Sequence, residues 1–215
     1  MAAQKNSLKN SKPLRIVANV LIALGIIGSA AIAYQLWGTN ITSAILANQE
    51  RSALQKEFSQ SSKLVPSLVE PEASKAFALV TIPALGLKDF PLVQGIEDSD
   101  LAKGIGHYPG TAMPGGLGNF AIAGHRATNG EPFANFEKLA AGDKVYVQAA
   151  DATYVYSLEY DIKVKPSGTW VIDKNPKNMP VDNTRKLITL TTCDPKWNST
   201  HRWVWWGSLS EIIPN

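Results

Sequence analysis

The residue with the clearest chemical potential is Cys193, the only cysteine in a chain of 215 residues. A single cysteine excludes an internal disulfide and argues against a cysteine-based zinc cluster. A thiol becomes a nucleophile once it is ionised. Cys193 follows the apolar segment 187–192 and precedes Asp194 and Pro195, where a loop is expected. It is therefore a candidate nucleophile, and the alternative is an inert cysteine that packs as a small hydrophobe.

A nucleophilic thiol needs a neighbouring base, and the chain has three histidines: His107, His125 and His201. His125 follows the apolar segment 119–123, and Gly124 between them allows the backbone to turn without a steric penalty. A histidine at the end of a strand is more often structural than catalytic. Sequence position alone therefore gives His125 only a modest lead.

Acyl transfer also needs a positive charge or N–H donors aimed at the developing oxyanion. Arg202 begins the segment that follows the loop after Cys193. If the segments on either side of that loop pair as neighbouring strands, the guanidinium lies beside the thiol. Arg126 and Arg185 are the competing candidates. The sequence contains no HExxH, P-loop or GxGxxG motif.

The charges are unevenly distributed along the chain. The net charge is +3, with 21 basic and 18 acidic residues. Residues 1–49 hold no acid, and all of their bases lie near the N-terminus: Lys5, Lys9, Lys12 and Arg15. The remainder is nearly balanced, so the charge pattern does not support a nucleic-acid-binding face.

Residues 16–37 are uncharged and mostly apolar, and as a helix they are long enough to cross the hydrocarbon core of a membrane. Bases before this run predict a cytoplasmic N-terminus. A cleaved signal peptide is the alternative, but the apolar run is longer than the usual core of one. We therefore expect four parts along the chain: a cytoplasmic basic tip over 1–15, a transmembrane anchor over 16–38, a juxtamembrane stalk or linker over 39–75, and a catalytic domain over 76–215.

The last 140 or so residues are rich in short segments typical of strands, enough for one buried core. The expected strands cover residues 77–82, 87–93, 119–123, 143–149, 153–164, 185–192 and 202–209, with a short helix over 96–103. Residues 104–118, rich in glycine, are expected to form a long loop. Residues 40–62 favour a helix, and serines and prolines over 59–72 favour a linker. Many short strands and few helices indicate a closed barrel or a sandwich.

The combination of TLTTC at 189–193, Arg202 and NFAIAGHR at 119–126 resembles the sortase family. VTIPALGL at 80–87 is similar to the first barrel strand of that family. The segment 107–126 is similar to class E sortases, the housekeeping type of actinobacteria. The resemblance covers about residues 76–215 and implies an all-β fold, a closed eight-stranded barrel with short helices.

The resemblance also implies a cysteine transpeptidase with Cys193 as nucleophile and with His125 and Arg202 as its catalytic partners. Such enzymes cut a C-terminal sorting signal of secreted proteins, LPxTG or LAxTG, between Thr and Gly. They pass the acyl group to an amine of a peptidoglycan precursor or a lysine. Tyr108 and Thr192 are expected to contact the signal, and no metal or cofactor is expected.

Two other functions stay open at this point. An exported cysteine protease has the same need for a thiol and an imidazole. A non-catalytic, membrane-tethered β-domain would leave Cys193 inert. General anchoring of surface proteins and attachment of a pilus base are equally compatible with the sequence.

Overall fold

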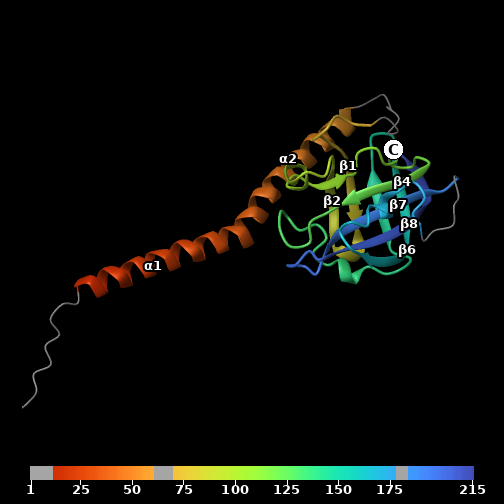
Figure 1. The fold of residues 1–215 in the computed structure, drawn as a ribbon. Helices are drawn as coiled ribbons and strands as arrows, with labels where there is room; N and C mark the ends of the chain where they lie inside the picture. The colour runs from red at the N-terminus through yellow and green to blue at the C-terminus, as the bar shows by residue number, and fades with distance from the viewer. Residues whose placement is uncertain (1–11, 61–69, 178–183) are drawn as a thin grey trace, which may run out of the picture. The chain divides into compact units, whose positions relative to one another are not determined.

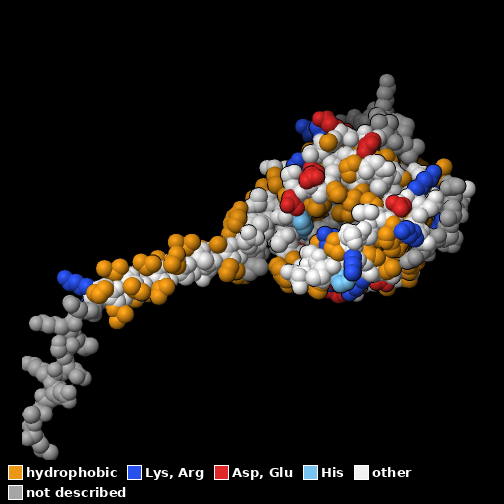
Figure 2. All heavy atoms as spheres, viewed as in Figure 1, with side chains coloured by type: hydrophobic (Ala, Val, Ile, Leu, Met, Phe, Trp, Pro, Cys, Tyr) orange, Lys and Arg blue, Asp and Glu red, His pale blue; other side chains and the backbone are white. Residues whose placement is uncertain are grey.

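The computed structural model describes residues 12–60, 70–177 and 184–215. The chain divides into two compact units, residues 1–38 and 39–215. The first contains the helix α1 (Lys12–Ala33) and the π-helical turn η1 (Tyr34–Gly38). No side chain of α1 is buried, and the helix is long and apolar enough to cross a membrane. Hydrophobic side chains cover its visible face in Figure 2, with basic side chains at its N-terminal end.

The second unit contains eight strands that close into a barrel (Figure 1). The strands are β1 (Ala76–Ile82), β2 (Leu87–Gln94), β3 (Ile105–His107), β4 (Gly118–Ala123), β5 (Lys144–Gln148), β6 (Ala152–Val164), β7 (Lys186–Asp194) and β8 (His201–Pro214). Their order around the barrel is β1-β2-β3-β4-β7-β8-β6-β5. The predicted closed, eight-stranded barrel is confirmed.

Two neighbouring pairs are parallel, β2 with β3 and β4 with β7, and the others are antiparallel. Every residue of β4 is buried. A strand paired on both sides and covered on both faces reads as a continuous apolar run, which explains the NFAIA segment. Because β4 and β7 run in the same direction, with Ala123 opposite Thr191, both strands end at the same rim of the barrel.

One detail of the strands differs from the prediction. The segment 104–118 is not a loop throughout, because residues 105–107 form β3. Gly106 permits this strand, since a Cβ there would lie 2.4 Å from the carbonyl oxygen of Gly95. Strand β2 continues through Pro91, where its second neighbour β3 has not yet begun, and an edge position tolerates a missing N–H. The predicted short helix is α3 (Asp98–Leu101).

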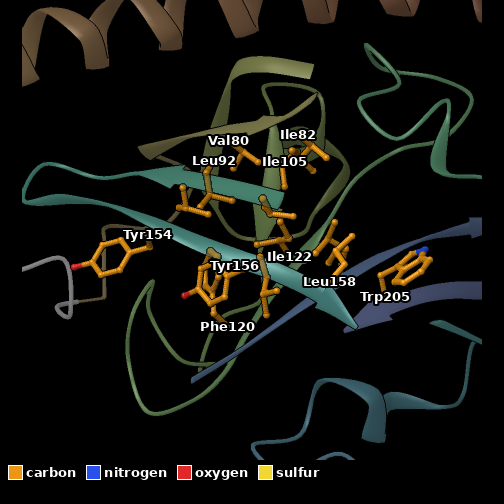
Figure 3. Close-up of a cluster of buried hydrophobic side chains, with 14 of the residues drawn as sticks. Val80, Ile82, Leu92, Ile105, Phe120, Ile122, Tyr154, Tyr156, Leu158 and Trp205 are labelled. Carbon is orange, nitrogen blue, oxygen red and sulfur yellow. The ribbon is translucent and has the colours of Figure 1, made fainter. Parts of the chain in front are cut away.

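The barrel interior is filled by side chains from most of its strands. In Figure 3, Val80, Leu92, Phe120 and Tyr156 lie in one cluster with their neighbours from other strands. All four are fully buried. This core provides the rigid frame on which the strand ends at the rim are held.

The helix α2 (Thr39–Gln60) covers nearly the whole segment that the composition predicts to be helical. It packs against β1 and β2, and it buries Ser43, Ala47 and Leu54. Most of the predicted linker over 59–72 lies outside the described residues.

Candidate active site

Three strand ends bring the predicted catalytic side chains together. Cys193 is the penultimate residue of β7, and Arg202 is the second residue of β8, directly opposite Cys193 in the β7–β8 ladder. His125 follows β4 by two residues. All three side chains line one cavity of about 270 Å³ at the rim of the barrel. The other lining residues are Ile96, Asp98, Leu101, Tyr108, Ala123, Gly124, Thr191 and Thr192.

Cys193 is free and partly exposed. It therefore differs from an inert cysteine sealed in a hydrophobic core, and its sulfur is open to a substrate that enters the cavity. An imidazole and a guanidinium line the same cavity. This arrangement places the groups needed for nucleophilic catalysis around one space.

His125 is partly buried, and its Nε2 lies 3.1 Å from Nδ2 of Asn129. Burial lowers the pKa of His125, and the carboxylate of Asp98 partly opposes this effect. The imidazole is therefore mainly neutral near pH 7 and available as a proton acceptor.

Gly124 has a different structural role from the one that the sequence suggests. Its φ is not positive, so backbone freedom is not the requirement. A Cβ at this position would lie 2.6 Å from Cδ2 of Phe133. The residue before His125 must therefore be small because an aromatic ring packs against its backbone.

The three candidate arginines have distinct surroundings. Arg126 is buried, forms ion pairs with Asp194 and Glu137, and lies 5.0 Å from the centre of the Trp203 ring. Its charge is thus already compensated. Arg185 pairs with Glu159 and does not line the cavity.

Arg202 donates to the backbone carbonyls of Ser199 and His201 and forms no ion pair within the described part of the chain. Its guanidinium lines the cavity beside Cys193. Of the three arginines, Arg202 is the one whose charge is available to an oxyanion in the cavity.

Tyr108 lies at the cavity wall, where its hydroxyl is 2.9 Å from Oγ1 of Thr191. Both residues, with Arg202, also line a neighbouring pocket of about 80 Å³. Thr192 is buried, and its hydroxyl donates to the carbonyl oxygen of Gly124 over 2.7 Å. This bond ties the end of β7 to the residue before His125. Contact of Tyr108 or Thr192 with a substrate stays a prediction.

The other two histidines do not line the cavity. His107 is fully buried, with Nδ1 2.7 Å from Oε1 of Gln94 and Nε2 3.0 Å from Oγ1 of Thr111. Burial lowers its pKa. His201 is exposed, and its Nδ1 lies 3.0 Å from the hydroxyl of Thr200. His107 therefore has a structural role in the turn that carries Tyr108.

Sequence reasoning missed three residues of the site. Thr191 is two positions before Cys193, and the alternation of side chains along a strand could have indicated it. Asp98 lies in an acidic stretch of a short predicted helix, a position typical of a solvated face, yet it lines the cavity. Asn129 had no detectable signal, because its contact with His125 depends on the path of the following turn.

A scan against family models matches the sortase domain over residues 80–210, more than half of the chain. The chain belongs to the sortase family. The sortase SrtE1 of Streptomyces coelicolor is 37% identical over 208 residues, which cover 93% of this chain and 58% of that protein. The sortase SrtE2 of the same species is 26% identical and is covered over 83% of its length. Among solved structures, sortase E of Streptomyces avermitilis superimposes with a TM-score of 0.61 at 37% identity, covering 67% of this chain and 93% of that one.

Strong similarity to class E members agrees with the resemblance noted in the 107–126 segment. This chain spans a little more than half of the length of SrtE1. Membership of the family therefore does not by itself assign substrates or partners to this chain.

Proposed function

We propose that this sortase is a membrane-anchored cysteine transpeptidase that cuts an LPxTG-like or LAxTG-like signal between Thr and Gly and joins the Thr to an amine. The observation that carries the proposal is that Cys193, His125 and Arg202 line one cavity at the rim of the barrel. A nucleophile, a proton carrier and a fixed positive charge are the three groups that acyl transfer requires.

In the first half of the reaction, the Cys193 thiol gives its proton to the imidazole of His125, and the thiolate attacks the carbonyl carbon of the signal's Thr. The carbonyl oxygen becomes an oxyanion, which the guanidinium of Arg202 stabilises. The bond between Thr and Gly then breaks. His125 returns the proton to the departing Gly amine, and a thioester remains on Cys193.

In the second half, an incoming amine attacks the thioester carbon. His125 accepts the proton that this amine loses, and the thiolate of Cys193 leaves. A neutral imidazole is needed at the moment of each proton acceptance, and the burial that lowers the pKa of His125 supports this role. The product is an amide between Thr and the acceptor, either a peptidoglycan precursor or a lysine side chain.

Recognition of the signal is assigned to the wall around Tyr108, with Thr192 as a further contact. Tyr108 lines both the catalytic cavity and the adjacent pocket, which supports a contact between its side chain and a peptide bound at Cys193. The sortase E1 of Streptomyces coelicolor has a structure with a tripeptide in the active site, which supports a peptide as the substrate.

The cellular setting follows from the helix α1. Its length and composition support a single membrane span, with the N-terminus in the cytoplasm and the catalytic domain outside the cell. An anchored enzyme meets exported proteins and lipid-linked acceptors at the same surface, which raises their effective concentration. The expected biological result is attachment of surface proteins, or of a pilus base, to the cell wall.

The test uses the full chain in detergent, LPxTG and LAxTG peptides, an amine donor, and mass analysis of the products. The expected product is the peptide cut after Thr and joined to the donor, and Cys193→Ala should form none. Release of only the free carboxylate at saturating donor would indicate a cysteine protease. Equal product formation by Cys193→Ala would contradict the proposed nucleophile.

A further inference from the structure

The turn that follows His125 is held by a helix far away in the sequence. Asn40, at the start of α2, accepts a hydrogen bond from the Gly130 N–H at 3.0 Å through Oδ1. Its Nδ2 donates to Oε1 of Glu131, also at 3.0 Å. One side chain of α2 therefore binds both the backbone and a side chain of this turn.

The turn needs external support because its backbone is strained. Asn129, Gly130 and Glu131 have φ values of 51°, 76° and 36°, all in the left-handed region. Residues other than glycine adopt such values at a cost, and they persist where neighbouring groups determine the conformation. The two hydrogen bonds from Asn40 supply that constraint.

The first residue of this turn reaches the catalytic histidine. Nδ2 of Asn129 lies 3.1 Å from Nε2 of His125. An amide NH₂ group only donates, so Nε2 of the neutral ring accepts this bond. The bond therefore sets the orientation of the neutral ring, and it opens when Nε2 takes up a proton in the proposed reaction.

The last residue of the turn binds the segment that follows β7. Oε2 of Glu131 forms an ion pair of 2.9 Å with Nζ of Lys196, which lies in the segment after Cys193. Glu131 thus connects Asn40 with the loop between β7 and β8.

We infer that Asn40 and Asn129 are positioning residues for His125, and that α2 is part of the catalytic apparatus because Asn40 holds the turn from which Asn129 binds the imidazole. The inference rests on the proposed acid–base role of His125. It adds that the helix preceding the barrel affects the rate of catalysis through a specific hydrogen-bonded chain.

Docking of α2 by itself does not require Asn40. Buried Ser43, Ala47 and Leu54 continue the contact further along the helix. Truncating Asn40 should therefore leave the helix in place while it releases the turn. Asn48 offers a matched control on the same helix, because its Oδ1 accepts from Arg51 of α2.

The experiment compares four variants of the full chain in detergent: Asn40→Ala, Asn129→Gly, the double variant and Asn48→Ala. Glycine is chosen at position 129 because it tolerates a positive φ. The readouts are kcat and KM for peptide transfer, the titration of His125 by NMR, and the thermal midpoint. The charged and titratable groups around His125 stay unchanged in all four: Asp98, Arg126, Glu131, Cys193, Lys196 and Arg202.

Asn129→Gly should lower kcat about five- to tenfold, with little change in KM, as expected for one lost hydrogen bond. In this variant the pKa of His125 should rise, because the lost bond stabilises the neutral ring. Asn40→Ala should change both quantities in the same direction and by less. The double variant should match Asn129→Gly, because Asn40 acts through Asn129, and Asn48→Ala should match the parent.

If the effects of Asn40→Ala and Asn129→Gly on kcat and on the pKa of His125 were strictly additive, Asn40 would not act on His125 through Asn129. An unchanged His125 titration in Asn129→Gly would overturn the whole inference, whatever the thermal midpoint. The titration needs no peptide substrate. A protein that transfers no peptide but shows the expected titration shifts would contradict the proposed function and leave the positioning chain supported.

Discussion

Buried Arg126 and partly buried Asp194 form an ion pair, so the residues that directly follow His125 and Cys193 in sequence bind each other. Burial disfavours the charged carboxylate, but hydrogen bonds from Lys163 and Arg126 hold the pKa of Asp194 below its ordinary value. The pair therefore joins the ends of β4 and β7 just beyond the two proposed catalytic side chains.

Arg126→Gln should destabilise the fold by about 2–4 kcal/mol, because it leaves a partly buried carboxylate with one cationic partner. It should also lower the transfer rate, since the two strand ends lose a link. Chemical denaturation of the full chain measures the first effect. Arg185→Gln is the control, because its pair with Glu159 is more exposed and should contribute about 1 kcal/mol or less.

Arg202→Ala should lower kcat about 10²- to 10³-fold, the usual effect of losing one oxyanion donor. The fold should change little, because the Arg202 side chain donates only to nearby backbone carbonyls. Single-turnover thioester formation measures the effect, with the thermal midpoint as the stability control. A decrease in kcat of less than tenfold would indicate that backbone N–H groups, and not Arg202, stabilise the oxyanion.

Stability should decrease as the pH falls below about 6.5, the ordinary pKa of histidine. Burial lowers the pKa values of His107 and His125, so the unfolded chain binds protons in this range that the folded chain does not. The free energy of unfolding therefore rises with pH until the histidines of the unfolded chain are neutral. As the pH falls, this stabilisation is lost progressively until the folded histidines take up protons at their lowered pKa values.

The matched variant for this pH effect is His107→Gln. It removes the more deeply buried of the two imidazoles, so its stability should depend less steeply on pH between about 5 and 7. Its stability at pH 8 should also be lower, because the bonds to Gln94 and Thr111 are lost. Parallel pH profiles in parent and variant would exclude His107 as a source of the effect.

Gly124→Ala should impair both stability and transfer. The added Cβ would lie 2.6 Å from the Phe133 ring, so either the ring or the backbone before His125 must move. Overpacking of this kind costs about 1–3 kcal/mol. Gly28→Ala provides the control, because a Cβ at position 28 meets no atom within 4 Å. Full activity in Gly124→Ala would show that the site tolerates movement of the β4 end.

Much of the barrel could be predicted from local sequence. Short apolar segments bounded by glycine and proline indicate strands wherever one face is buried. Seven of the eight barrel strands were expected near their observed positions. The strand β3 escaped prediction because it has only three residues, and Gly104 and Gly106 at its start are typical of a loop. These glycines instead allow a close approach to other backbone, because a Cβ would lie 2.3 Å from the carbonyl oxygen of Pro91 at position 104 and 2.4 Å from that of Gly95 at position 106.

The amino-acid sequence by itself determined that this protein has one thiol, an apolar N-terminal helix and the motifs of a sortase. The tertiary structure decided which arginine remains available, since the fold buries Arg126 in ion pairs and places Arg202 in the cavity wall. It also brought Asn129 to the histidine and Asn40 to the turn that carries Asn129. Hydrogen bonds between residues far apart in the chain leave no periodic pattern, because they depend on where strands and helices meet.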